Sequence, residues 1–279
     1  PGSASASEVK TFTEDGIYTV TATAVDAAGN RNTQSVTFTI DRTAPVLSIS
    51  GISEGAYSNS PVTLNFQAVE SFYETDNVAI TVERRLEGSA YGSTVNFVNS
   101  GKTSSIRNTF AVDGEYIVTM TAIDAAGNTA ATQTLRFTID VTAPLVTIAG
   151  TEDYFITKTP ISLLFSVIES YYATNQVKIS GTRRTVQGRT EPVNIEGWAN
   201  TGKTSTLENA FSEDGYYTIT IAATDRAGNA RQQTIHFTID TEAPVIADLS
   251  RYDGKYFQSF RLEEELEDLI SELTAPTVR

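Results

Sequence analysis

The same stretch of sequence occurs three times in this chain, and the repetition constrains the fold more than any other feature. It reads DGIYTVTATAVDAAGN at 15–30, DGEYIVTMTAIDAAGN at 113–128 and DGYYTITIAATDRAGN at 214–229. Each copy is followed by FTID and then by an Ala-Pro pair. The spacing is 98 residues from Asp26 to Asp124 and 101 residues from Asp124 to Asp225. A period of this length is the size of a small domain, so the chain is predicted to be a tandem array of domains.

The repeated stretch has the pattern of a β-hairpin. In the first copy, every second residue from Tyr18 to Ala24 is apolar, and threonines alternate with these residues. A period of two predicts a half-buried strand. Gly29 and Asn30 follow, and both residue types accept positive φ in a turn. Residues 35–40 alternate again, so each copy is predicted to form the two strands that close a domain.

The repeats divide the chain into complete and partial units. Complete units are expected at 45–143 and 144–243, residues 1–44 hold only the last strands of a unit, and 244–279 form a C-terminal extension or the start of a further unit. Strands of the first complete unit are predicted at 46–50, 62–69, 78–82, 93–98, 105–111, 116–124 and 132–139. Short strands separated by closely spaced turns predict an all-β chain of tandem β-sandwiches.

The C-terminal extension breaks the strand pattern. Its apolar residues sit at helical spacing among acidic residues: Leu262, Leu266, Leu269, Ile270 and Leu273. This spacing predicts a short amphipathic helix over 261–273. The alternative is that the extension is the irregular opening of a further sandwich.

Composition excludes several classes of function. The chain has no cysteine, which rules out disulfides and thiol chemistry. Acidic residues outnumber basic ones 34 to 20, giving a formal net charge of -14. Such a chain repels nucleic acids and anionic membranes and attracts divalent cations. No apolar run approaches the length of a transmembrane helix, and direct membrane insertion is therefore not expected.

A tyrosine corner motif gives the array a family resemblance. In the first complete unit, Asp113, Gly114, Tyr116 and Val118 form the pattern Asp-Gly-x-Tyr-x-Val, in which the phenol packs inward and its hydroxyl bonds to upstream backbone. Val118 stands where an antibody domain has its second cysteine. With the Asp-x-Ala-Gly-Asn turn and the Thr-Ala-Pro joint, this pattern resembles the bacterial immunoglobulin-like repeats of large cell-surface proteins and adhesins over residues 10–244.

The resemblance implies a fold, a location and a function. It implies tandem immunoglobulin-like β-sandwiches, located extracellularly on a bacterial cell surface or secreted. It implies a non-enzymatic structural and adhesive role as a stalk segment, and in some relatives calcium stiffens the joints between domains. We keep two alternatives: a module that binds a glycan or a host protein, and an accessory region of a secreted carbohydrate-active enzyme. The incomplete N-terminal unit lacks partner strands, which predicts strand pairing with another chain.

Oxygen-bearing side chains are predicted to gather at the joints. In an immunoglobulin-like sandwich the chain enters at the end that carries the loops after the second and sixth strands, so the last residue of one unit lies beside these loops of the next. The first joint gathers Asp41, Glu70, Glu74, Asp76, Asp124 and Asn128. The second gathers Asp140, Glu169, Asp225 and Asn229, with Ala173 and Asn175 in place of Glu74 and Asp76. These oxygens suit calcium, and the second site is expected to be weaker.

Ordinary structural roles are the alternative for the same residues. Asp124 and Asn128 can shape a hairpin turn through bonds to the backbone. Asp41 and Asp140 can cap a linker turn before proline. Glu70 and Glu169 can form ion pairs with Arg85 and Arg184.

Two aromatic pairs in the corresponding loops are candidate ligand contacts: Phe72 with Tyr73, and Tyr171 with Tyr172. Exposed rings can stack on a sugar, whereas the alternative is that one ring packs into the core and the other covers the joint. His236 is the only histidine and takes the strand position of Thr37 and Arg136, which indicates an outward, replaceable site. It has no thiol or marked serine partner, and the sequence contains no phosphate loop or zinc spacing, so no enzyme activity is predicted.

Overall fold

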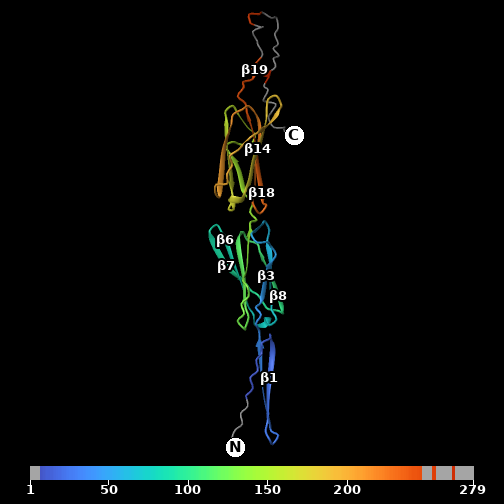
Figure 1. Cartoon of the computed structure of the whole chain (residues 1–279). Coiled ribbons are helices and arrows are strands. Elements are labelled where there is room, and N and C mark those ends of the chain that lie inside the picture. Colours follow the sequence, from blue (N-terminus) through green and yellow to red (C-terminus); the bar gives the residue numbers. More distant parts are fainter. Residues whose placement is uncertain (1–6, 247–252, 256–265, 268–279) are drawn as a thin grey trace. The chain divides into compact units, whose positions relative to one another are not determined.

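The computed structural model describes residues 7–246, 253–255 and 266–267 (Figure 1). The chain forms two compact units, Pro1–Asp140 and Val141–Arg279. Both consist of strands, and the helices among the described residues are the short 3-10 helices η1 (Tyr73–Thr75) and η2 (Tyr172–Thr174). Within the described part of the chain, no helix has the length and hydropathy of a membrane span. The all-β prediction is confirmed.

The first unit begins with an isolated hairpin. Strands β1 (Gly16–Val25) and β2 (Arg31–Ile40) pair antiparallel from Gly16↔Ile40 to Val25↔Arg31 and form a two-stranded sheet (Figure 1). One face carries hydroxyl pairs, of which Thr21 and Ser35 are 2.8 Å apart. The other face is apolar and open: Val20 is 37% and Val36 57% exposed.

The rest of the first unit is a sandwich of two sheets. The three-stranded sheet has the order β3 (Val46–Ser50), β5 (Val62–Val69), β8 (Thr103–Phe110). The five-stranded sheet has the order β4 (Ala56–Ser58), β10 (Gln133–Ile139), β9 (Gly114–Ile123), β6 (Asn77–Leu86), β7 (Ser89–Val95). Strands β3 and β5 have the bounds that the sequence predicts.

The second unit repeats this architecture. Its three-stranded sheet has the order β11 (Leu145–Ala149), β13 (Ile161–Ile168), β16 (Thr204–Phe211). Its five-stranded sheet has the order β12 (Phe155–Thr157), β18 (Ala230–Ile239), β17 (Gly215–Thr224), β14 (Gln176–Arg184), β15 (Thr190–Val193). Each sandwich therefore closes its own core between two sheets.

Two strands of the first sandwich differ from the sequence-based expectation. The strand predicted at 93–98 is instead β7, which starts at Ser89 and pairs with β6. The reason is the turn between them: Glu87 and Gly88 both have positive φ (49° and 82°), the geometry of a two-residue hairpin. Strand β4 was not predicted. It is three residues long and pairs parallel with the end of β10, too short to show a periodic pattern.

Alternation of residue type builds the cores. On β5 the inward positions are Val62, Leu64, Phe66 and Ala68, and on β9 they are Tyr116, Val118, Met120 and Ala122. All are buried, and they belong to one hydrophobic cluster between the two sheets. Burial of such side chains is the main stabilising term of a cysteine-free sandwich, at about 25 cal/mol per Å² of apolar surface.

The tyrosine corner occurs in all three copies of the repeat. The hydroxyl of Tyr116 donates to the carbonyl oxygen of Val112 at 2.6 Å, that of Tyr217 to Glu213 at 2.7 Å, and that of Tyr18 to Glu14 at 2.8 Å. The Tyr116 ring stacks on Phe137 with centroids 4.9 Å apart. The hydroxyl bond and the stacked ring together fix where strand β9 starts.

Steric crowding explains why a glycine, Gly114, lies two residues before the tyrosine of the corner. Gly114 has φ of 153°, and a Cβ there would lie 2.9 Å from the carbonyl oxygen of Arg85 on the neighbouring strand. Only glycine allows β9 and β6 to approach so closely at this point.

The C-terminal extension is described only in part. Strand β19 (Val245–Ile246) pairs antiparallel with β20 (Leu266–Glu267). These two residues of the predicted helix over 261–273 are therefore in a strand, and the other residues of that prediction lie outside the described residues.

We expect Tyr116→Phe to lower the free energy of unfolding of the first sandwich by about 1 kcal/mol, because the bond from the buried Tyr116 to the carbonyl of Val112 is lost. Denaturant-dependent hydrogen exchange of the β6 and β9 amides measures this loss, since the single tryptophan, Trp198, packs in the second unit. Tyr18→Phe on the open hairpin is the matched control and should change the same transition by less than about 0.5 kcal/mol. An unchanged midpoint for Tyr116→Phe would contradict a stabilising role for the corner bond.

Candidate functional site

Three buried carboxyl groups of the first unit lie just beyond the ends of strands, at positions whose side chains face the same way as the core residues of those strands. Glu70 follows β5 in phase with Phe66 and Ala68, and Asp124 follows β9 in phase with Met120 and Ala122. Asp76 precedes β6 in phase with Val78 and Ile80, and it ends the 3-10 helix η1. Since side chains alternate along a strand, these acids point toward the interior at one end of the sandwich. With Asp41, at the end of the hairpin, they form what we call the carboxylate cluster: Asp41, Glu70, Asp76 and Asp124.

The carboxylates of this cluster act on one another. Glu70 is 4% and Asp124 5% exposed. The pKa of Asp76 is raised to about 6, mainly by burial and then by the negative charges of Glu70, Asp124 and Asp41, in that order. Both carboxylate oxygens of Asp76 are buried and have no hydrogen-bond donor. Such a group is costly to bury without a partner, so the cluster has the electrostatics of a cation site.

Turn chemistry accounts for Asp124 and Asn128 without a metal. The backbone N–H of Asn128 donates to Oδ1 of Asp124 at 2.9 Å, and its Nδ2 donates to Oδ2 at 2.8 Å. The same two bonds join Asn30 to Asp26 on the exposed hairpin tip, at 2.8 and 2.7 Å. There Asp26 has no buried acidic neighbours, and its bonds to Asn30 lower its pKa. The turn is therefore a structural motif, and burial among other acids is what distinguishes Asp124.

A contact links the turn to the segment before the sandwich. Nδ2 of Asn128 also donates to the backbone carbonyl of Asp41 at 3.1 Å. The carboxylate of Asp41 accepts the N–H of Thr43 at 3.1 Å, as the predicted linker turn requires. Asp41 is thus held at the end of the sandwich where the buried carboxylates lie.

The ion pair predicted as the alternative for Glu70 is wrong. Arg85 pairs with Glu83 on its own strand at 2.5 Å. Oε1 of Glu70 instead accepts the N–H groups of Ser71 and of Phe72, the latter at 3.2 Å. The Glu70 N–H donates to the carbonyl of Lys102 at 2.9 Å. Arg85 lies at the far end of β6 from the carboxylates, because it is in register with Glu115, whereas Asn77 at the start of β6 is in register with Ile123, the neighbour of Asp124.

The second unit has the same arrangement with fewer acidic side chains. Glu169 and Asp225 are each 5% exposed, and their carboxylate oxygens lie within 4.8 Å of one another. Asn175 takes the place of Asp76, and its amide oxygen is buried without a hydrogen-bond donor. The turn bonds recur, with Asn229 donating to Asp225 at 2.9 and 2.7 Å. Asp140 is buried, and its N–H donates to the carbonyl of Ser58 within the first unit at 2.9 Å.

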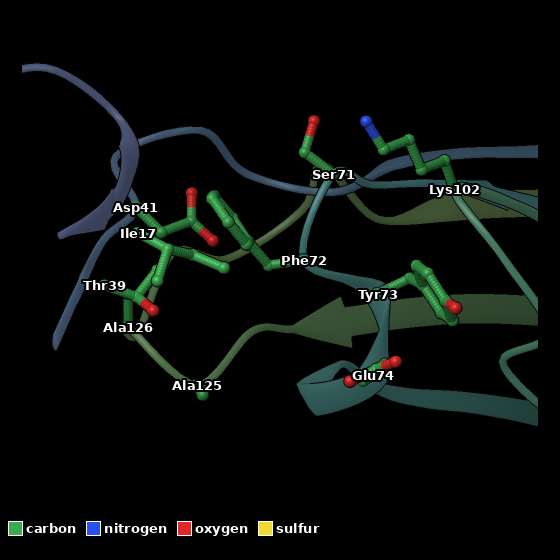
Figure 2. A pocket seen from close by; sticks show the side chains of 10 residues that line it. All are labelled: Ile17, Thr39, Asp41, Ser71, Phe72, Tyr73, Glu74, Lys102, Ala125 and Ala126. Atoms are coloured by element: carbon green, nitrogen blue, oxygen red, sulfur yellow. The ribbon is translucent and has the colours of Figure 1, made fainter. Parts of the chain in front are cut away.

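The remaining predicted residues of the first unit line a cavity of about 580 Å³ (Figure 2). Phe72 and Tyr73 are half-buried and Glu74 is exposed. Figure 2 shows the two rings extending to opposite sides of the loop, with Phe72 on the side of Asp41. In the second unit, Tyr171 and Tyr172 are also half-buried. Neither pair packs a ring fully into the core.

Sequence reasoning missed the residues that hold the loop in place. Nδ2 of Asn99 donates to the carbonyl of Asp76 at 2.8 Å, and Asn200 does the same for Asn175 at 2.8 Å. The hydroxyl of Ser104 accepts the N–H of Ser100 at 2.8 Å and closes the turn that contains Lys102. The repetition of Asn-x-Gly-Lys-Thr-Ser in both units was the available signal.

His236 is more constrained than its strand position indicates. Its ring stacks on Tyr154 at 4.9 Å and lies near-parallel to Tyr216 at 6.0 Å. Its Nδ1 lies 3.0 Å from a carboxylate oxygen of Asp153. Tyr154 has φ of 61°, where the first unit has Gly55. The stack lies on the outer face of the five-stranded sheet and contains no nucleophile.

A family model agrees with this architecture, and two solved structures are similar to the chain. A family model described as a bacterial Ig-like domain matches residues 2–42, 47–141 and 157–241. The chain is similar to the tetra-tandem repeat in the extending region of a large adhesion protein, with 23% identity, 83% of this chain and 58% of that chain covered, and a TM-score of 0.42. It is also similar to fibronectin(III)-like modules of CbhA from Clostridium thermocellum, with 12% identity, 70% and 94% covered, and a TM-score of 0.26.

No curated protein matches the sequence. The chain spans 58% of the length of the adhesion-protein structure. The family model, in contrast, matches most of the chain in three consecutive segments that each contain one copy of the repeat. The chain therefore belongs to the bacterial Ig-like domain family, of which it is a tandem array.

Proposed function

We propose that this chain is a non-enzymatic extension segment of a bacterial surface protein of the adhesin type, located outside the cell. Membership of the bacterial Ig-like family supports this proposal. So does the repetition of one sandwich design, which lengthens a chain without adding a catalytic centre. The observation that carries the mechanism is the carboxylate cluster, whose member Asp76 has two buried oxygens without a donor.

The cluster is proposed to bind calcium and so to stiffen the joint at Asp41. Asp41, Glu70, Asp76 and Asp124 supply carboxylate oxygens, and the side-chain oxygen of Asn128 is a further donor. Calcium takes six to eight oxygen ligands in flexible geometry, and it would neutralise the charges that raise the pKa of Asp76. Glu74, exposed on η1, is an outer ligand at most in this proposal.

In the second unit, the predicted residues Glu169, Asp225 and Asn229 are proposed to bind calcium more weakly. Glu169 and Asp225 form a buried pair, but Asn175 and Ala173 replace two acids of the first unit. Fewer charged ligands lower calcium affinity.

The other expectations stay predictions. Strand pairing of the N-terminal hairpin with another chain is compatible with the exposure of Val20 and Val36, and a monomer by light scattering that loses residues 1–40 to proteolysis would contradict it. Binding of a host protein or an accessory role beside a carbohydrate-active enzyme has no specific observation in its favour.

We expect calcium to raise the melting temperature of the first sandwich, since a ligand at 100 times its dissociation constant stabilises by about 2.7 kcal/mol. Calorimetry and small-angle scattering in calcium and then in excess chelator measure the gain and the predicted stiffening. Asp76→Asn should abolish most of this gain. Asp26→Asn is the matched control, because it changes the same type of residue outside the cluster and should keep the gain. Equal melting temperatures in calcium and chelator would refute the metal site.

The pH dependence of stability in chelator follows from Asp76. Its folded pKa of about 6 lies above the unfolded value, so the folded state binds more protons between about pH 4 and 6. The contribution of Asp76 to the free energy of unfolding is therefore fully present below about pH 4 and is lost as the pH rises to about 6 and beyond. Asp76→Asn should remove this loss. At pH 8 the free energy of unfolding of the variant should exceed that of the unsubstituted chain by roughly 1–2 kcal/mol, after allowance for solvent screening. Parallel pH profiles for the two proteins would show that Asp76 is not strained by its neighbours.

A further inference from the structure

The cavity of the first unit brings together side chains from four separate segments. The base of the hairpin contributes Ile17, Thr39 and Asp41, the loop after β5 contributes Ser71–Glu74, and the turns after β7 and β9 contribute Lys102, Ala125 and Ala126 (Figure 2). Its volume of about 580 Å³ is within the range of small-molecule sites, roughly 300–1,000 Å³. Of the carboxylate cluster, only Asp41 also lines this cavity.

The lining combines apolar and polar groups in the manner of a ligand site. Phe72 and Tyr73 provide aromatic surface, and both are only half-buried. Around them stand the Ser71 hydroxyl, the Glu74 carboxylate and the Lys102 ammonium group. A ring with apolar C–H faces and polar edges can stack on such a surface while its hydroxyl groups bond to the surrounding polar groups.

The charges around the cavity decide between classes of such ligands. Asp41 and Glu74 carry negative charge and Lys102 alone carries positive charge. The net charge of the lining is therefore negative, as is that of the chain, at -14. An acidic sugar would be repelled, whereas an uncharged sugar finds both hydrogen-bond donors and acceptors.

We propose that this cavity binds a neutral saccharide, with Phe72, on the side of Asp41, as the stacking residue, Tyr73 as a flanking aromatic contact, and Glu74 and Lys102 as hydrogen-bonding residues. This gives the extension segment an adhesive contact of its own, separate from its proposed mechanical role. Neither Phe72 nor Lys102 belongs to the carboxylate cluster, so the saccharide contact is tested in chelator, separately from calcium binding.

Saturation-transfer NMR on the full chain tests the proposal, with lactose, cellobiose and N,N′-diacetylchitobiose as neutral probes and sialyllactose as the anionic one. All samples contain excess chelator, so that failure of the calcium proposal leaves the result interpretable. We expect saturation transfer to at least one neutral probe and clearly weaker transfer to sialyllactose. No transfer to any neutral probe, or equal transfer to sialyllactose, would overturn the proposal.

Substitutions locate the binding. Phe72→Ala should weaken binding of the responding probe about tenfold, the effect of losing one stacked ring, and Tyr73→Ala should weaken it less. Glu74→Gln, at an exposed position that leaves the fold intact, should weaken it less. Tyr91→Ala is the control, since Tyr91 is exposed on β7 and does not line the cavity. Binding that survives the Phe72 and Tyr73 substitutions, or that falls equally with Tyr91→Ala, would place the saccharide elsewhere and contradict the assignment.

Discussion

The alternation of side chains along strands β5, β6 and β9 determines both the core and the candidate site. The tyrosine corner fixes the start of β9, and from Tyr116 onward every second residue enters the core. Asp124 falls on the same phase as Met120 and Ala122, so the register that buries the apolar residues also buries this carboxylate. Glu70 beyond β5 and Asp76 before β6 follow the same rule. The site is thus a continuation of the core in which acids replace apolar residues.

Acids at core positions oppose folding, which is why we assign them a role. A fold stabilised only by packing would place apolar or hydrogen-bonded residues there. The hairpin shows that the turn does not require this burial, because Asp26 makes the same bonds to Asn30 in an exposed position. In the second unit, where Asn175 replaces Asp76, the repulsion is smaller and so is the expected affinity for a cation. If the acids bind a cation, the first unit should therefore bind it more tightly than the second.

Much of this structure could be predicted from the sequence, for reasons that are visible in particular residues. Apolar and polar residues alternate clearly along β5, and β3 pairs with it over its whole length, so the bounds of both strands match the prediction. The three-residue strand β4 has no period to detect, and the position of β7 depends on positive φ at Glu87, which no pattern reveals. The sequence indicated that Asp41, Glu70, Asp76 and Asp124 gather. It could not show that Asp76 lacks a donor or that Arg85 pairs with Glu83, because both depend on side-chain placement.

The position of a bound ion is the most direct test of the proposed site. Crystals of the full chain grown in calcium should show an ion with a carboxylate oxygen of Asp76 at about 2.3–2.6 Å, together with oxygens from Glu70, Asp124 or Asp41. Difference density at that distance, absent from crystals grown in chelator, is the result that the account predicts. If the Asp76 oxygens are instead bonded to ordered water or to a side-chain donor in both crystals, the cluster is not a calcium site.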